Sequence, residues 1–292
     1  MRPRRSDPMW QDELASASEA DRSWRLSPLL DVHALGKAYP SRQGRDQRWA
    51  IRDLSFSVRP YEFLTIVGPS GAGKTTLLNV LAQVEAATTG RIQFESQLWP
   101  IGDPQALAPG LGCRIGYVTQ DDNLLPWRTA LANILLPLEI QGRLQPAARL
   151  RAQGLVHAVG LSGFEHHYPH QLSGGMRKRV ALARTLVYDP PVILMDEPFS
   201  MLDAEMRNAL QEDLLNLWAR RRKTIVFVTH DIAEAIALGD RTLVLTPSPA
   251  CVRSEHAILL GRPRDVRGIL ADPVFQGLFR TIRGEVEWRC PQ

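Results

Sequence analysis

The segment GPSGAGKT at residues 68–75 leaves few folds open to this chain, because it stands between a short apolar run and a helical pattern. The run before it, FLTIV at residues 63–67, is typical of a buried strand, and TLLNVLAQV follows it. Glycines at this spacing let backbone N–H groups surround phosphate oxygens, and the helix adds its positive amino end. The pattern predicts a phosphate-binding loop in which Lys74 neutralises the β- and γ-phosphates of a nucleotide and the Thr75 hydroxyl holds Mg²⁺. The candidate nucleotide-contacting residues of this loop are Gly68, Pro69, Ser70, Gly71, Ala72, Gly73, Lys74, Thr75 and Thr76.

Two acidic residues follow another apolar run, in PVILMDEP at residues 191–198. Asp196 is placed to bind the metal, and Glu197 is placed to polarise a water for in-line attack on the γ-phosphate. A third run, TIVFVTHD, ends at His230, where strand ends and phosphates converge. Position alone leaves open whether His230 is structural or contacts phosphate.

The remaining pattern predicts an α/β fold with a mostly parallel sheet, because apolar strand-like runs alternate with helical segments. Two strand patterns near residues 29–35 and 54–58 predict an N-terminal antiparallel portion, with a polar turn at 41–48 between them. Residues 121–190 are rich in Leu and Ala and predict an inserted α-helical subdomain. We expect a flexible tail at 1–28, a core domain at 29–261 and a helical extension at 262–292.

Composition supports a globular chain, with 44% hydrophobic and 23% charged residues. No run approaches the roughly 18 apolar residues of a membrane helix, and the first ten residues lead into no apolar segment, so we expect an intracellular chain. The net charge is +4, with 35 basic and 31 acidic residues. Because the two signs nearly balance, we favour a solvated surface and expect no nucleic-acid partner.

The motif LSGGM at residues 172–176 distinguishes this chain from other phosphate-loop proteins. It opens an amphipathic pattern, so Ser173, Gly174 and Gly175 form a second anion-binding helix end. The nucleotide of the chain already has the helix that follows Gly73, so this second end suits the γ-phosphate held by another subunit. A two-fold pair of chains with two nucleotides at the interface would use both helix ends in two equivalent sites. A simple Gly-Gly turn would also fit these residues alone.

Together these motifs resemble the nucleotide-binding subunit of an ABC transporter, continuously from about Leu29 to Leu245 and in the order of that family. The resemblance implies an ATP- and Mg²⁺-dependent ATPase with the P-loop NTPase fold. It implies that Tyr39 stacks on adenine, that Gln120 in YVTQ contacts Mg²⁺ and water, and that His230 contacts the γ-phosphate. It also adds Gln171, just before the LSGGM motif, and Asp203, in SMLD at 200–203, to the nucleotide site.

Several segments are similar to the importers of nitrate, sulfonate and taurine within this family. These segments are NLLPWRTALANILLPLE, LSGGMRKRVALARTL, DEPFSMLDAEMR, VTHDIAEAIALGDR, and the tail motifs PRD and DPVF. The chain departs from the usual pattern at Arg177, where many members have Gln, and at Met201, where a small residue is usual.

The resemblance implies transmembrane permease partners, a separate solute-binding protein, an ATP-bound homodimer and a peripheral location on the cytoplasmic face of the cell membrane. The apolar segment Leu124 to Trp127, after Gln120, is the expected contact with the permease. The alternatives are an ABC ATPase for lipid trafficking or export and a soluble ABC ATPase acting on DNA or ribosomes. A P-loop kinase would leave LSGGM unexplained.

Overall fold

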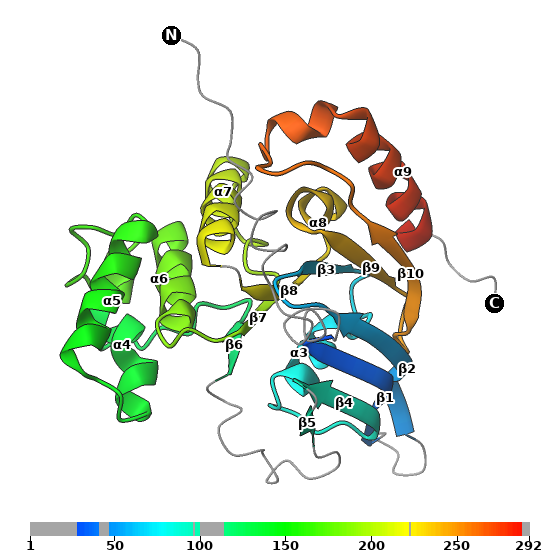
Figure 1. Cartoon of the computed structure of the whole chain (residues 1–292), viewed down its shortest axis with the longest axis horizontal. Helices are drawn as coiled ribbons and strands as arrows, with labels where there is room; N and C mark the ends of the chain where they lie inside the picture. The colour runs from blue at the N-terminus through cyan, green and yellow to red at the C-terminus, as the bar shows by residue number, and fades with distance from the viewer. Residues whose placement is uncertain (1–27, 41–46, 96, 100–113, 222, 288–292) are drawn as a thin grey trace, which may run out of the picture.

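The computed structural model describes residues 28–40, 47–95, 97–99, 114–221 and 223–287. The expected tail at 1–28 lies outside these residues, apart from its last residue. Figure 1 shows two sheets that meet near α3 (Lys74–Leu81), a group of helices on one side of the main sheet, and a C-terminal helix across its far end.

The larger sheet has six strands in the order β10-β9-β3-β8-β7-β6. Their bounds are β3 (Phe63–Val67), β6 (Ile115–Val118), β7 (Val192–Asp196), β8 (Thr224–Thr229), β9 (Arg241–Leu245) and β10 (Val252–Ala257). All neighbours pair in parallel except β10 with β9. The central strands β3, β7 and β8 are buried along their whole length, which explains their unbroken apolar sequences.

Alternate side chains of this sheet enter two different hydrophobic cores. Phe63 and Val67 of β3 pack with the helical side, whereas Leu64 and Ile66 pack with α3 and the N-terminal sheet. Because both faces are covered, the carboxyl ends of the parallel strands are the part of the sheet that carries polar loops.

The smaller sheet is antiparallel, with the order β2-β1-β4-β5. Its strands are β1 (Leu30–Pro40), β2 (Gln47–Val58), β4 (Thr89–Phe94) and β5 (Gln97–Leu98). Leu77, Leu78 and Leu81 of α3 belong to the same core as these strands, so α3 is held between the two sheets. The N-terminal antiparallel portion is confirmed. The expected turn at 41–48 is too long, since Gln47 and Arg48 already pair within β2.

The helical portion between β6 and β7 is also confirmed. It contains α4 (Ala130–Ile140), α5 (Pro146–Ala158), the short η2 (Pro169–Gln171) and α6 (Gly174–Leu186). After β7, α7 (Ala204–Arg221) and α8 (Ile232–Leu238) continue the layer on this side of the sheet. Val180, Ala183 and Val187 are buried, as their helical spacing predicts.

The C-terminal part contains β10, η3 (Gly268–Ala271) and α9 (Pro273–Glu287). The closing helix is confirmed, but β10 was not predicted, because its polar sequence VRSEHA pairs with β9 at the edge of the sheet. The domain boundaries at 29–261 and 262–292 stay predictions.

Candidate active site

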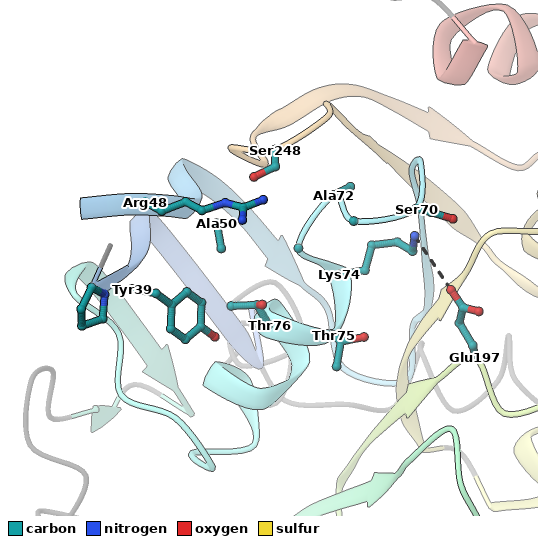
Figure 2. A pocket seen from close by; sticks show the side chains of 13 residues that line it. Tyr39, Arg48, Ala50, Ser70, Ala72, Lys74, Thr75, Thr76, Glu197 and Ser248 are labelled. Carbon is teal, nitrogen blue, oxygen red and sulfur yellow. Dashed lines mark ion pairs between the residues drawn. The ribbon is translucent and has the colours of Figure 1, made fainter. Parts of the chain in front are cut away.

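A cavity of about 920 Å³ opens where β3 meets α3, on the side of the N-terminal sheet (Figure 2). Most of the predicted phosphate loop and one of the two predicted carboxylates line it. The lining residues are Tyr39, Pro40, Arg48, Ala50, Ser70, Gly71, Ala72, Gly73, Lys74, Thr75, Thr76, Glu197 and Ser248. The candidate residues for phosphate, adenine and catalysis are thus partly assembled in one place.

The backbone of the loop between β3 and α3 requires Gly73 to be a glycine. Its φ of 90° is left-handed, and an added Cβ would lie 2.8 Å from the carbonyl oxygen of Ala50. Gly73 caps α3 at the amino end, so the unpaired N–H groups of this helix face the cavity. The backbone therefore forms an anion site beside Lys74.

Lys74 is buried and turned into the loop. Its Nζ donates hydrogen bonds to the carbonyl oxygens of Gly68 at 2.9 Å and Pro69 at 3.1 Å, and lies 3.9 Å from Oε1 of Glu197 (Figure 2). Burial lowers the pKa of Lys74, and the charges of Glu197 and Asp196 oppose that shift. Gly68 and Pro69 therefore position the ammonium group, although they do not line the cavity.

Thr75 and Asp196 meet at the end of β7. The Thr75 hydroxyl donates a hydrogen bond to the Asp196 carboxylate, which is buried. Burial raises the pKa of Asp196, and Glu197 raises it further, while Thr75 and Lys74 lower it. A hydroxyl and a carboxylate are oxygen ligands that suit Mg²⁺. Among the described residues no group of three His, Cys, Asp or Glu side chains gathers at a metal-binding distance, so a metal here needs further oxygens from phosphate or water.

Glu197 occupies a strained position directly after β7. Its φ is 42°, and its N–H donates to the carbonyl oxygen of Val228 at 2.9 Å. Oε2 lies 2.7 Å from Nδ1 of His230, so the structure brings these two predicted residues together. The backbone bond to β8 thereby fixes the carboxylate at the rim of the cavity.

Gln120 follows β6 and is exposed outside the cavity. Its Nε2 lies 3.4 Å from Oγ of Ser200, and Ser200 donates to the carbonyl oxygen of Glu197 at 3.0 Å. Lys178 of α6 donates to the Gln120 carbonyl oxygen. Gln120 is therefore connected to Glu197 through one serine, and among the described residues no hydrogen bond joins its side chain to Thr75 or Asp196.

Tyr39 lines the opposite end of the cavity from Glu197 (Figure 2). Its hydroxyl donates to Glu85, and its side chain also hydrogen-bonds with Thr76. Lys37 lies over its ring, with Nζ 5.0 Å from the ring centroid. Burial raises the pKa of Tyr39, and the bond to Glu85 adds to the shift. These contacts fix the ring at the end of the cavity away from Glu197, and its stacking on adenine stays a prediction.

The residues of the LSGGM motif lie at the start of α6 and do not line the cavity. Ser173 caps the helix by accepting a hydrogen bond from the Met176 N–H at 3.3 Å. A Cβ added at Gly175 would lie 2.1 Å from Sδ of Met206, so a larger residue there requires the Met206 side chain to move. Gln171 accepts a hydrogen bond from the Tyr168 N–H at 2.8 Å.

Asp203 is exposed before α7 and also lies outside the cavity, where it accepts from the Met206 N–H at 2.9 Å. Within one chain, the LSGGM residues and Asp203 are thus separate from the phosphate loop. The loop 200–203 and the amino end of α6 are joined through Met206 of α7.

Sequence analysis missed the cavity residues Pro40, Arg48, Ala50 and Ser248. No motif marks them, since they reach the cavity only through tertiary packing. The loop before β10 pairs with β2, where the Ala250 N–H donates to the Ala50 carbonyl oxygen at 2.9 Å. Figure 2 shows the Arg48 side chain extending from β2 along the cavity wall.

The profile of the ABC transporter family matches residues 51–200. The chain belongs to the ABC transporter family. It is an ATPase of that family, and its α/β cassette fold agrees with the expectation. No helix in the described part of this ABC protein is long and apolar enough to cross a membrane.

Three curated relatives cover most of this ABC protein. It is 41% identical over 247 residues, covering 85% of this chain and 88% of the relative, to an uncharacterized ABC transporter ATP-binding protein, MJ0412, of Methanocaldococcus jannaschii. It is 37% identical to the taurine import ATP-binding protein TauB of Yersinia pestis, covering 88% and 97% of the two chains. It is 36% identical to the aliphatic sulfonates import ATP-binding protein SsuB of Bacillus licheniformis, covering 90% and 94%.

A solved structure supports the same assignment. The dimeric structure of the bacterial ABC transporter cassette MJ0796 superposes with a TM-score of 0.69 at 32% identity, covering 80% of this chain and all of that one. A second structure of MJ0796 is a dimeric post-hydrolysis state bound to ADP and Pi.

Proposed function

We propose that this ABC ATPase powers an importer of a small anionic solute of the nitrate, sulfonate and taurine type. The observation that carries the ATPase chemistry is Glu197, whose carboxylate lies between Lys74 at 3.9 Å and His230 at 2.7 Å. The names of the relatives, taurine import and aliphatic sulfonates import, support the importer type.

ATP would lie along the cavity between Tyr39 and the phosphate loop. The backbone N–H groups of the loop 68–76, apart from Pro69, and the Lys74 ammonium would hold the phosphates, and the Tyr39 ring would stack on the adenine. Thr75, Asp196 and Gln120 would hold Mg²⁺, which supplies charge neutralisation on the phosphate oxygens when bound. The hydroxyl–carboxylate pair of Thr75 and Asp196 fits this role.

Glu197 would accept a proton from the water that attacks the γ-phosphate, and its oxygen on the cavity side would orient that water. His230 would donate a hydrogen bond to the γ-phosphate or to Glu197. This bond would stabilise the negative charge that develops there during hydrolysis. Gln120 is connected to Glu197 through Ser200. A shift of the segment 121–127 would therefore move Gln120 together with the loop 197–200.

The working unit would be a two-fold homodimer with ATP between the subunits. Five predicted site residues do not line the cavity of their own chain, which supports a role at the ATP of the second copy. These residues are Gln171, Ser173, Gly174, Gly175 and Asp203. The dimeric structures of MJ0796 support the same assembly. ATP would favour the closed dimer, and hydrolysis would release it.

The permease would dock on the segment after Gln120, and a separate solute-binding protein would deliver the solute. Trp127 is 71% exposed, whereas Leu124 is buried, so the indole is available on the surface while its loop is fixed. Arg177 supports this loop by pairing with Asp122 at 2.9 Å. Docking would place the chain peripherally on the cytoplasmic face of the membrane.

Reconstituted transport tests this proposal. The chain would be purified from membranes with its co-purifying permease, and the complex incorporated in vesicles that enclose Mg-ATP. Radiolabelled taurine, an alkanesulfonate and nitrate would be offered outside, each with the solute-binding protein of the system. We expect ATP-dependent uptake of one of these anions, and its loss with Lys74→Ala. Failure of all three anions in vesicles that still hydrolyse ATP would exclude this solute class while leaving the ATPase assignment intact.

A further inference from the structure

A polar network lies beneath the turn that carries His230, and no step of the proposed hydrolysis uses it. The network joins the start of α7 to the start of α8. Its members are Arg207, Gln211, Thr229, Asp231 and Glu234. Gln211, Thr229 and Glu234 are buried, so their polar groups are satisfied only by one another and by the backbone.

The network fixes the backbone on both sides of His230. The Asp231 N–H donates to Oγ1 of Thr229 at 3.0 Å. The Thr229 hydroxyl hydrogen-bonds with Glu234, and Nε2 of Gln211 donates to Oε1 of Glu234 at 2.8 Å. Gln211 belongs to α7, so the turn around His230 is anchored to a helix that begins immediately after Asp203.

Arg207 connects this turn to the loop that precedes α7. Its Nη2 donates to the carbonyl oxygen of Leu202 at 3.0 Å, and its Nη1 lies 3.7 Å from Oδ2 of Asp231. Nε is buried without a hydrogen-bond partner among the described residues. The guanidinium is thus hydrogen-bonded on one side and ion-paired on the other, and its buried Nε leaves one N–H unpaired among the described residues, so it is more constrained than an arginine with no such contacts.

The neighbouring residue extends the connection to α6. Met206 occupies the space beside Gly175, and its N–H is held by Asp203. The first turn of α7 therefore contacts the start of α6, the loop 200–203 and, through Arg207, the His230 turn.

We propose that Arg207 is a positioning residue that couples the His230 turn to the loop carrying Asp203. This inference rests on the proposed function, in which His230 serves the ATP of its own chain and Asp203 faces the second copy. With Arg207 in place, a shift of His230 toward the γ-phosphate is accompanied by a shift of the 200–203 loop. Without it, ATP still binds to the phosphate loop, but His230 is no longer held beside Glu197 in the hydrolytic arrangement.

The test compares Arg207→Met and Arg207→Lys in the full chain, with steady-state ATP hydrolysis and direct ATP binding. Arg207→Met should lower kcat by about tenfold or more while leaving the affinity for ATP within about twofold, because the residue acts on geometry and not on the phosphates. Arg207→Lys keeps the positive charge but can reach only one of the two partners, so its kcat should lie between those of Arg207→Met and the wild type. Arg267→Met is the matched control, since Arg267 pairs with Glu212 on the exposed side of the same helix at 3.8 Å. It should not change kcat.

A double-mutant cycle with Asp231→Asn separates positioning from folding. Asparagine keeps an oxygen that can accept from the Ala233 N–H, as Asp231 does at 2.9 Å, but loses the charge facing Arg207. If the two residues act together, the double variant should be no slower than Arg207→Met alone. Additive losses, or wild-type kcat in a folded Arg207→Met protein, would overturn the proposal. If those variants are active while Lys74→Ala is inactive, the ATPase assignment stands and only the positioning role fails.

Discussion

Oε2 of Glu197 and Nδ1 of His230 lie 2.7 Å apart, although 33 positions separate the two residues in the chain. The bond joins the ends of neighbouring parallel strands, since Glu197 follows β7 and His230 follows β8. The other carboxylate oxygen lies 3.9 Å from Nζ of Lys74. The sheet thus brings together the three groups that we propose act on the γ-phosphate, at the end of the cavity that Lys74 and Glu197 line.

Replacing the loop lysine should weaken nucleotide binding strongly. In Lys74→Ala the charge of the β- and γ-phosphates is left uncompensated, and the affinity for Mg-ATP should fall by at least about tenfold. Isothermal titration calorimetry measures it. Lys223→Ala, which removes a lysine paired with Asp189 at 2.9 Å outside the cavity, should bind ATP as the wild type does. Equal affinities of Lys74→Ala and Lys223→Ala would remove the site assignment.

Arg48 should contribute to ATP affinity. Among the described residues that line the cavity, the positive side chains are Arg48 and Lys74, and Lys74 faces Glu197. Arg48→Gln should weaken ATP binding by about three- to tenfold and make it less sensitive to salt, because one charge-assisted contact is lost. Arg52→Gln on the same strand is the control, since Arg52 is exposed and does not line the cavity. Identical salt dependence of the two variants would contradict this role.

The glycine that caps α3 should not tolerate a side chain. Gly73→Ala places Cβ 2.8 Å from a carbonyl oxygen at a φ of 90°, so it should lower the free energy of unfolding by about 1–3 kcal/mol and weaken ATP binding. Gly154→Ala is the opposite case, because Gly154 lies inside α5 and a Cβ added there would meet no atom within 4 Å. That change should stabilise the protein by about 0.5–1 kcal/mol. Urea denaturation distinguishes the two, and a stabilised Gly73→Ala would contradict the loop geometry.

Glu234 should make stability depend on pH. Burial raises the pKa of Glu234 from 4.5 to about 7, and Asp231 adds to the shift, while Thr229, Gln211 and Arg207 oppose it. Between these pH values the folded protein binds a proton that the unfolded chain has released, so the free energy of unfolding falls as pH rises from about 5 to 7. Glu234→Gln has no such group to titrate, so its free energy of unfolding should not fall in this way. Relative to the wild type, it should therefore rise by at most about 3 kcal/mol over that pH window.

Denaturation at several pH values between 5 and 8 gives the difference between Glu234→Gln and the wild type. The exposed Glu205→Gln on α7 should follow the wild-type pH dependence, apart from a constant offset. A difference between Glu234→Gln and wild type that does not change with pH would show that Glu234 does not titrate in this window.

The parts of the fold with strong local signals were predicted from the sequence. The buried strand FLTIV, the glycine loop and α9 follow from apolar runs, φ requirements and helical spacing. β10 was missed because it is a polar edge strand whose pairing with β9 supplies the order that its sequence lacks. Local patterns do not encode that partner.

The candidate site shows the same division. Gly73, Lys74, Thr75 and Asp196 were predicted, because phosphate and magnesium chemistry demand those residue types at the ends of strands. Arg48 and Ser248 come to the cavity from β2 and from the loop before β10, so only the tertiary structure identifies them. The same holds for Arg207, whose hydrogen-bond partner Leu202 and ion-pair partner Asp231 lie on either side of α7 in the sequence.

We propose that ATP binds between two copies of this chain and that Glu197 is the base whose action ends the closed state. Light scattering on Glu197→Gln with saturating Mg-ATP tests this assembly, because the variant keeps the shape of the site and loses the proton acceptor. We expect a shift from the 32.7 kDa mass of one chain to twice that mass, and no shift when Ser173→Arg is added. A Glu197→Gln protein that binds ATP yet stays at the mass of one chain, or a dimer that Ser173→Arg leaves intact, would contradict it.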